Sequence, residues 1–374
     1  MEADIEVRNL AIYVHIPFCK QKCKYCDFNS FYVGDEGKIH QYIKAVCKQI
    51  EYYSNSATDF TVTSVYFGGG TPSFIKEKYI KFIMEKIKKF YNVSEDAEIT
   101  IEVNPGTITL KKLKKYREIG INRISIGVQT LNDKLLMEIG RIHTAQEARE
   151  CFHLAREAGF YNISMDIMFG LPDQEIKDIE NTLDEFMSFN PEHISAYSLK
   201  VEAGTVFGKL YAEKKLNLPS ESSERDMYYL IKRKLKKFGY NQYEISNFSK
   251  PGYESKHNMA YWKRQDYLGV GISAASCFNE VRFTNTYNFL EYINNPIDNF
   301  SESEILTEDV IESERIILGL RLLEGVNEGN FNKKEWKQSL KKLIEKGLLT
   351  NSDGKIILTD KGLDLANQVF VEFI

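Results

Sequence analysis

The chain has 374 residues, of which 43% are hydrophobic and 27% charged, a composition typical of a globular protein with a full core. Its 49 Lys and Arg residues against 53 Asp and Glu leave a net charge of −4, which argues against binding nucleic acid through a basic surface. No apolar run approaches the roughly 20 residues needed to span a bilayer, and no targeting segment is recognisable. We therefore expect a cytoplasmic protein without an integral membrane segment.

Three cysteines follow the first apolar segment, residues 12–16, with the spacing Cys19-x3-Cys23-x2-Cys26. Cysteine thiolates hold iron–sulfur clusters, and three of them on one loop can ligate three irons of a [4Fe–4S] cluster. The open fourth iron could chelate the amino and carboxylate groups of S-adenosylmethionine (SAM). Zinc with His15 as a fourth ligand is an alternative, although no second Cys or Cys/His pair follows. A disulfide framework is disfavoured in a long chain with six cysteines.

Short apolar segments alternate with amphipathic ones over the first 210 residues. The apolar segments predict strands at 12–16, 62–67, 99–103, 124–128, 163–169 and 193–199. The amphipathic segments predict helices at 38–53, 76–90, 109–119, 145–158 and 174–189. Strands without polar alternation indicate a sheet buried on both faces, and the strand–helix repeat makes it parallel. We predict an α/β fold with a partial (β/α)6 TIM-like barrel; a doubly wound sheet is the alternative.

Polar residues occur toward the ends of these predicted strands: Gly68-Gly69-Gly70-Thr71 after the second, Glu102 and Asn104 on the third, Gln129 after the fourth and Asp166 within the fifth. The carboxyl-end rim is the active face of a barrel, and a carboxylate in an apolar strand is costly to bury alone. The glycines lack nucleotide-loop spacing, so they predict either a tight turn or close approach to a ligand. Glu102, Gln129 and Asp166 are candidates for SAM hydroxyl or amino groups. Arg141 is a candidate for the SAM carboxylate.

The second half of the chain departs from the strand–helix repeat near residue 217. We expect a helix at 225–238, a strand at 240–245, a loop-rich stretch at 246–288, and helices with a small hairpin after 307. The predicted regions are a barrel at 1–217, a flanking segment at 218–300 and a C-terminal α+β module at 301–374. That module resembles a winged helix, for which DNA binding and packing are both open; the acidic charge favours packing.

The remaining cysteines and one histidine complete the candidates. Cys47 and Cys151 lie on apolar helix faces and are expected to be small core residues, and Cys277 is given no role. His257 is expected in a loop beside Tyr261 and Trp262, where it could be an axial heme ligand with rings packed on the porphyrin. A local hydrogen bond of the histidine is the alternative.

The motifs together resemble the oxygen-independent coproporphyrinogen III oxidase superfamily of radical SAM proteins. The resemblance rests on the Cys19–Cys26 motif, Gly-Gly-Gly-Thr-Pro, Glu102-Val-Asn-Pro, Gly127-Val-Gln129 and Asp166-x3-Gly-Leu-Pro. It implies that Cys19, Cys23 and Cys26 hold a [4Fe–4S] cluster. It also implies a SAM site formed by Tyr13, Tyr25, Gly69, Gly70, Thr71, Glu102, Gln129, Arg141 and Asp166.

Two departures separate this sequence from the oxidase itself. The oxidase has a fourth cysteine two residues after the third, where this chain reads Asp27-Phe28, and it has a long N-terminal extension, whereas the cluster strand here begins about a dozen residues from Met1. His257-Asn258-x-x-Tyr261 is similar to the His-Asn-x-x-Tyr motif of the HemW branch. That resemblance implies a heme chaperone in which His257, supported by Asn258 and Tyr261, contacts heme. Acceptor hemoproteins and an electron donor for the cluster would be its partners; porphyrinogen oxidation is the alternative activity.

Overall fold

A curved sheet of six consecutive parallel strands forms the body of the protein. The computed structural model describes residues 8–374, so the first seven residues of the predicted barrel region lie outside the described part. The strands run in the order of the sequence. They are β1 (Arg8–Ile16), β2 (Phe60–Gly69), β3 (Asn92–Val103), β4 (Arg123–Gln129), β5 (Ile163–Phe169) and β6 (His193–Ser198). All six predicted strands are confirmed.

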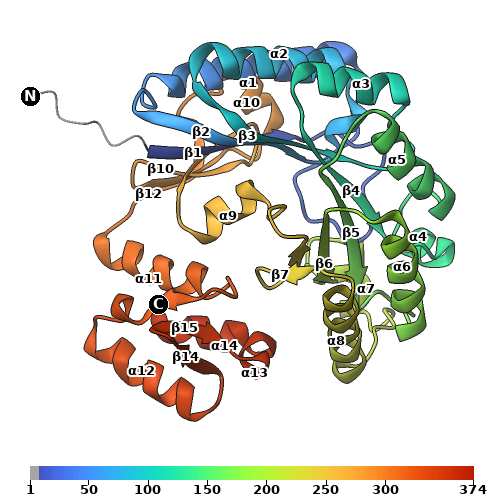
Figure 1. The fold of residues 1–374 in the computed structure, drawn as a ribbon. Coiled ribbons are helices and arrows are strands. Elements are labelled where there is room, and N and C mark those ends of the chain that lie inside the picture. Colours follow the sequence, from blue (N-terminus) through green and yellow to red (C-terminus); the bar gives the residue numbers. More distant parts are fainter. Residues whose placement is uncertain (1–7) are drawn as a thin grey trace, which may run out of the picture.

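Helices between these strands cover the outer face of the sheet (Figure 1). The helices are α1 (Glu36–Ser54), α2 (Glu77–Phe90), α3 (Leu110–Ile119), the short α4 (Asp133–Glu138), α5 (Ala145–Glu157) and α6 (Ile176–Phe189), with a 3-10 turn at Pro72–Phe74. Thr144 and Glu147 form a reciprocal capping box at the start of α5. The predicted partial (β/α)6 barrel is thereby confirmed, and the doubly wound alternative is wrong.

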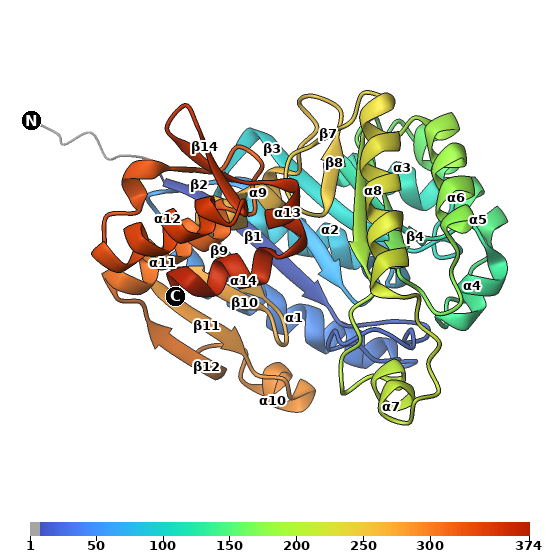
Figure 2. The ribbon, with the colours of Figure 1, turned by 90° about the horizontal axis from the view of Figure 1, so that it is seen from below.

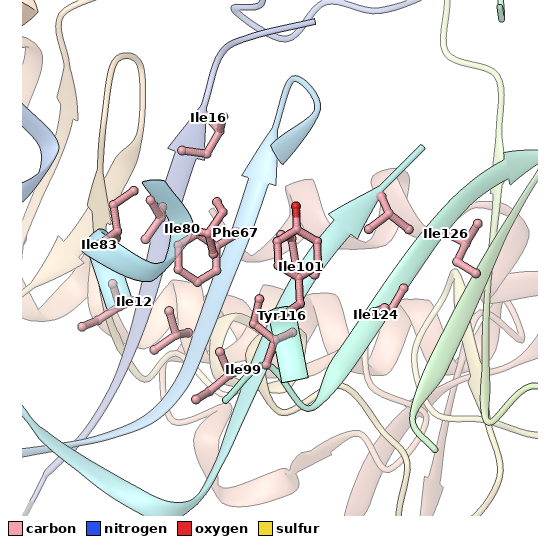
Figure 3. Close-up of a cluster of buried hydrophobic side chains, with 14 of the residues drawn as sticks. Ile12, Ile16, Phe67, Ile80, Ile83, Ile99, Ile101, Tyr116, Ile124 and Ile126 are labelled. Atoms are coloured by element: carbon pink, nitrogen blue, oxygen red, sulfur yellow. The ribbon is translucent and has the colours of Figure 1, made fainter. Parts of the chain in front are cut away.

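The main core lies between the sheet and these helices. Figure 3 shows Ile99 and Ile101 of β3 with Ile124 of β4 on this face, together with Ile80 of α2 and Tyr116 of α3. The last four of these are fully buried. Full burial of an aliphatic side chain contributes about 1.5–3 kcal/mol, so this layer holds the helices on the sheet.

The inner face of the sheet is polar, which corrects the prediction of strands without alternation. In β3, Glu98, Thr100 and Glu102 alternate with isoleucines, and the other strands follow the same period of two. Many of these inward side chains are buried: Ser64, Glu98, Thr100, Arg123, Ser125, Ser164 and His193. Both faces are buried as expected, but one face packs as a core and the other faces a polar interior.

Both edges of the sheet are extended by later segments, giving 12 strands in the order β12-β11-β10-β9-β1-β2-β3-β4-β5-β6-β8-β7. The predicted loop-rich stretch 246–288 is therefore wrong, since it contains four strands and a helix. The added strands are β7 (Asn241–Gln242), β8 (Asn247–Ser249), β9 (Asp266–Val270), β10 (Ala275–Phe278), β11 (Val281–Asn285) and β12 (Phe300–Ile305). Helices α7 (Val206–Ala212), α8 (Glu221–Lys237), α9 (Lys256–Trp262) and α10 (Phe289–Asn294) connect or flank them.

The C-terminal module has its own small core of Ile316, Trp336, Leu340, Ile356 and Phe373. It contains α11 (Glu308–Gly319), β13 (Val326–Asn327), α12 (Lys334–Glu345), β14 (Leu349–Ser352), β15 (Lys355–Leu358), α13 (Asp360–Asp364) and α14 (Ala366–Phe370), with 3-10 turns at Glu328–Asn330 and Val371–Phe373. The expected hairpin is β14–β15, and β13 adds a third strand. The α+β character of the module is confirmed, while the three region boundaries stay predictions. Within residues 8–374 no helix is long and apolar enough to cross a membrane.

Candidate functional site

The cysteine loop lies at the carboxyl end of β1 and is held by its neighbours. Cys19 N–H donates to Phe31 O at 3.1 Å, and Cys26 N–H donates to Cys23 O at 3.2 Å in a tight turn. On one side, Lys24 N–H donates to Ile139 O at the end of α4, and Lys24 O accepts a hydrogen bond from Phe207 N–H of α7. On the other side, the Asn29 side chain donates to Tyr287 O beside α10. Figure 2 shows α7 and α10 at this end of the barrel.

One cavity of about 350 Å³ opens beside this loop and collects most of the predicted site. All three cysteines of the motif line it, as do eight of the nine predicted SAM residues: Tyr25, Gly69, Gly70, Thr71, Glu102, Gln129, Arg141 and Asp166. Tyr13 is the exception: it does not line the cavity, but its ring stacks on that of Tyr66, which does, with centroids 6.3 Å apart. The sequence motifs therefore converge in space, although they are spread over 148 positions, from residue 19 to residue 166.

The zinc alternative gains no support from the geometry. Both ring nitrogens of His15 are engaged, Nε2 with Asn29 O at 3.0 Å and Nδ1 with Tyr13 Oη at 3.1 Å. Across the described residues 8–374, no three His, Cys, Asp or Glu side chains are grouped as ligands for one metal ion. His15 instead fixes the base of the cysteine loop.

The triple-glycine loop packs closely against His15 and the start of the cysteine loop. Gly69 has a φ of 110°, and a Cβ atom there would lie 2.5 Å from the His15 ring. At Gly70 a Cβ atom would lie 2.9 Å from Ile16 O and 3.1 Å from Cys19 Sγ. Both positions therefore require glycine. The tight turn and the close approach to the site, which the sequence offered as alternatives, occur together in this loop.

A chain of hydrogen bonds connects the cavity arginine to the first cysteine. Arg141 donates from Nη1 to Asn104 Oδ1 at 2.9 Å, and Asn104 Nδ2 donates to Thr71 Oγ1 at 2.9 Å. Thr71 Oγ1 lies 3.3 Å from Cys19 Sγ. A guanidinium can only donate, so the Asn104 oxygen must face Arg141 and its amide nitrogen must face Thr71. When Cys19 is a thiolate, the Thr71 hydroxyl must donate to it.

Two carboxyl groups in the cavity are held in a poorly solvated environment. Burial, helped by the nearby Asp166, raises the pKa of Glu102 to about 7, against hydrogen bonds from Tyr66 and Gly69 that lower it. Burial likewise raises the pKa of Asp166 to about 6, against hydrogen bonds from Ser195 and Ser125. A carboxyl with a raised pKa gains most from a ligand that offers it hydroxyl or ammonium donors.

Gln129 closes the cavity from β4. It is buried, its φ of 70° is unusual for a residue other than glycine, and Tyr197 Oη donates to its Oε1 at 2.8 Å. A Cβ atom at Gly127, two residues earlier, would lie 2.8 Å from Asn104 Oδ1 and 3.0 Å from Arg141 Nη2. This part of β4 is thus shaped by the cavity groups next to it.

The histidine motif does not lie in a loop, which corrects that expectation. His257 is in the first turn of α9, it is 2% exposed, and it does not line the cavity. Its Nδ1 is hydrogen-bonded to Ser64 Oγ at 2.9 Å and its Nε2 to Tyr261 Oη at 3.1 Å. Asn258 does line the cavity. The heme role of these residues stays a prediction.

Sequence reasoning missed four cavity residues that the polar alternation would have revealed. Tyr66, Ser125, Ser195 and Tyr197 all line the cavity from inward positions of β2, β4 and β6. Each lies an even number of residues from a polar neighbour on its own strand, so a search for period-two polarity would have found them.

The residues present fit a [4Fe–4S] cluster with bound SAM. Three thiols lie on one wall, and burial raises the pKa of both Cys19 and Cys26, so these thiols are not stabilised as free thiolates. Arg141 Nε is buried and has no hydrogen-bond partner among the described residues, as expected of a group reserved for an anion. The donor set of three cysteines is one that iron–sulfur clusters use.

Comparisons with known proteins agree with this geometry. The Radical SAM superfamily profile matches residues 13–186, and the HemN C-terminal domain profile matches residues 306–365. The solved structure of coproporphyrinogen III oxidase (HemN) from Escherichia coli, a radical SAM enzyme, aligns with a TM-score of 0.83 over 98% of this chain and 90% of that one. At 24% identity this likeness shows the fold. Fold and site thus define a radical SAM protein.

The relatives identify the family within that class. The heme chaperone HemW of Bacillus subtilis is 38% identical over 97% of this chain and 98% of its own length. The heme chaperone HemW of Lactococcus lactis is 34% identical over 97% of this chain and 96% of its own. The chain belongs to the HemW family.

Proposed function

We propose that this chain is a heme chaperone that holds a [4Fe–4S] cluster and SAM in the barrel cavity, binds heme and passes it to acceptor hemoproteins. The observation that carries the proposal is the convergence of the three motif cysteines and eight SAM candidates on one cavity. Kinship with proteins named heme chaperones supports the heme part. We place the protein in the cytoplasm, with an electron donor for the cluster as a further partner.

Each part of the cavity has a distinct role in this proposal. Cys19, Cys23 and Cys26 ligate the cluster, and the unpaired Nε of Arg141 meets the SAM carboxylate. Glu102 and Asp166 accept hydrogen bonds from the SAM amino or ribose groups. When bound and reduced, the cluster supplies the electron for reductive cleavage of SAM. The chain's own contribution is to position SAM and to exclude water around it.

Heme binding places a requirement on α9 if His257 is the ligand. Both of its ring nitrogens are engaged and the side chain is buried. Ligation of heme iron therefore requires Nδ1 or Nε2 to leave its hydroxyl partner, and α9 to shift from the barrel interior. We propose this shift as part of heme loading.

Anaerobic reconstitution tests the cofactor part of the proposal. The brown protein should contain about four irons per chain and bleach with dithionite. Cys23→Ala should lose most of this iron, whereas Cys151→Ala, a buried cysteine on α5, should retain it. A colourless protein, or equal iron in both variants, would contradict the proposal.

Heme titration tests the remaining part. Wild-type protein should develop a Soret band that saturates at a fixed heme-to-protein ratio, and His257→Ala should weaken it. An unchanged spectrum in the variant removes His257 as the ligand, and absence of any saturable band in the wild type removes heme binding itself.

A further inference from the structure

The helix that carries the histidine motif is built into the barrel. Figure 1 shows α9 on the side of the sheet opposite α1, α2 and α3. Its first turn is anchored by Glu98 of β3, whose Oε1 accepts from His257 N–H and from Ser255 Oγ, both at 3.2 Å, and whose Oε2 accepts from Lys256 N–H at 3.1 Å. Arg123 Nε lies 3.8 Å from Glu98 Oε2. The helix start is thus fixed to the buried Glu98, which is itself paired with the buried Arg123.

The imidazole of His257 is held in one orientation. Ser64 and Tyr261 occupy its two nitrogens, and the Tyr261 ring packs edge-on at a centroid distance of 5.0 Å. Burial, and after it the positive charge of Arg123, lower the pKa of His257 to about 3, so the ring is neutral. A neutral ring can stack on an aromatic neighbour and needs no counter-ion.

That neighbour is Tyr66, one inward position above Ser64 on β2. The rings of His257 and Tyr66 stack with centroids 5.0 Å apart and planes inclined by 24°. Tyr66 Oη donates to Glu102 Oε1 at 2.9 Å, while Gly69 N–H donates to Glu102 Oε2 at 3.2 Å. Tyr66 and Glu102 both line the cavity. The contacts therefore run from the motif helix to a carboxylate of the SAM site.

We propose that His257 is a positioning residue for SAM: by stacking on Tyr66 it holds the tyrosine hydroxyl on Glu102 and so fixes this carboxylate for the ligand. This assignment rests on the proposed SAM site, and it gives the histidine motif a role in the conformation where His257 is buried. Heme ligation by His257 and SAM positioning would then belong to two different placements of α9.

The test is SAM affinity of the cluster-reconstituted full chain without heme, measured by equilibrium dialysis of labelled SAM. Tyr66→Phe removes one oxygen and keeps the ring; it should weaken SAM binding about tenfold, the effect of one lost hydrogen bond to a charged group. His257→Ala should weaken binding to a similar extent. The double variant should bind SAM about as tightly as the single variant with the lower affinity, because both substitutions act on Glu102 through the same contact.

Two further variants separate positioning from simple structural support. His257→Phe loses both hydrogen bonds but keeps an aromatic face for Tyr66, so it should recover part of the affinity lost in His257→Ala. His153→Ala, which removes an exposed histidine that packs on Phe189 outside the barrel, should bind SAM like the wild type. The shift of the reduced cluster's electron paramagnetic resonance signal on adding SAM should follow the same order.

The outcomes distinguish a failure of the positioning role of His257 from a failure of the proposed SAM site. Wild-type affinity in Tyr66→Phe or in His257→Ala, with iron content unchanged, overturns the inference alone, as does additive weakening in the double variant or no recovery in His257→Phe. If reconstituted wild-type protein does not bind SAM, the SAM site itself fails. Should His257→Ala not fold, Tyr66→Phe and His257→Phe still decide the result.

Discussion

Thr71 Oγ1 lies 3.3 Å from Cys19 Sγ, so a side-chain hydrogen bond joins the glycine loop to the first cysteine of the motif. Asn104 donates to the same threonine oxygen, which leaves the Thr71 hydrogen for the sulfur when Cys19 is a thiolate. Two motifs that are 52 residues apart in the sequence thereby meet at one proposed cluster ligand.

Removing this hydroxyl should lower the reduction potential of the cluster. A hydrogen bond to a ligating sulfur stabilises the more negative, reduced state. Thr71→Val should shift the potential by roughly 60 mV to more negative values, equivalent to about a tenfold change for a one-electron couple. Thr71→Ser keeps the hydroxyl and should stay near the wild-type value in the same redox titration. Equal potentials in all three proteins would show that the contact does not influence the cluster.

The contribution of Glu102 to the stability of the cluster-free protein should fall as pH rises from about 5 to 7. The pKa of Glu102 is about 7 in the folded chain and near the ordinary value of 4.5 when unfolded, so between these values the folded state binds more protons. The Glu102 contribution to the unfolding free energy therefore decreases with pH in this window, by about 1–3 kcal/mol. Buried histidines with lowered pKa values act in the opposite direction but are common to wild type and Glu102→Gln, so urea titrations of both proteins at pH 5 and pH 8 isolate the contribution of Glu102. The advantage of wild type over Glu102→Gln should be smaller at pH 8 than at pH 5, and an equal difference at both pH values would assign the effect to other groups.

The stability of the protein should depend strongly on the buried ion pair between Arg123 and Glu98. Both side chains are almost fully buried, and Glu98 also anchors the start of α9. Arg123→Leu leaves the Glu98 carboxylate without its counter-charge, which should lower the unfolding free energy by about 3–5 kcal/mol. Lys177→Ala breaks an exposed pair with Glu180 and should change the unfolding free energy far less, because solvent screens that pair. Similar losses in both variants by urea titration would contradict this ranking.

The fold of the first half and the grouping of the three motif cysteines at one site were predictable from the sequence, because both depend on local patterns. Six strand–helix repeats predicted the barrel, and Cys19, Cys23 and Cys26, closely spaced on one loop, line one cavity. Because the carboxyl ends of the strands form the active face of a barrel, Glu102 and Asp166 were expected on one rim, and both line the same cavity.

The missed parts depend on contacts between distant segments. β9 pairs in parallel with β1, more than 250 residues earlier, and no local pattern marks such a partner. α9 has only seven residues, and its start is fixed by Glu98, 159 residues before His257. The polar inner face was overlooked for another reason: its serines and threonines are small residues that also fit apolar strands. Only the burial of Arg123 and Glu98 makes that face unmistakable.

The central claim, heme transfer by a radical SAM protein, is tested most directly by one paired assay. Reconstituted, heme-loaded protein is mixed anaerobically with an apo-hemoprotein, with SAM and reductant present, and the acceptor's own Soret band is followed. In parallel, the heme-free protein receives coproporphyrinogen III under the same conditions, and the products are separated by chromatography. The account predicts heme appearing in the acceptor and no decarboxylated porphyrinogen. Turnover of coproporphyrinogen without heme transfer would contradict it.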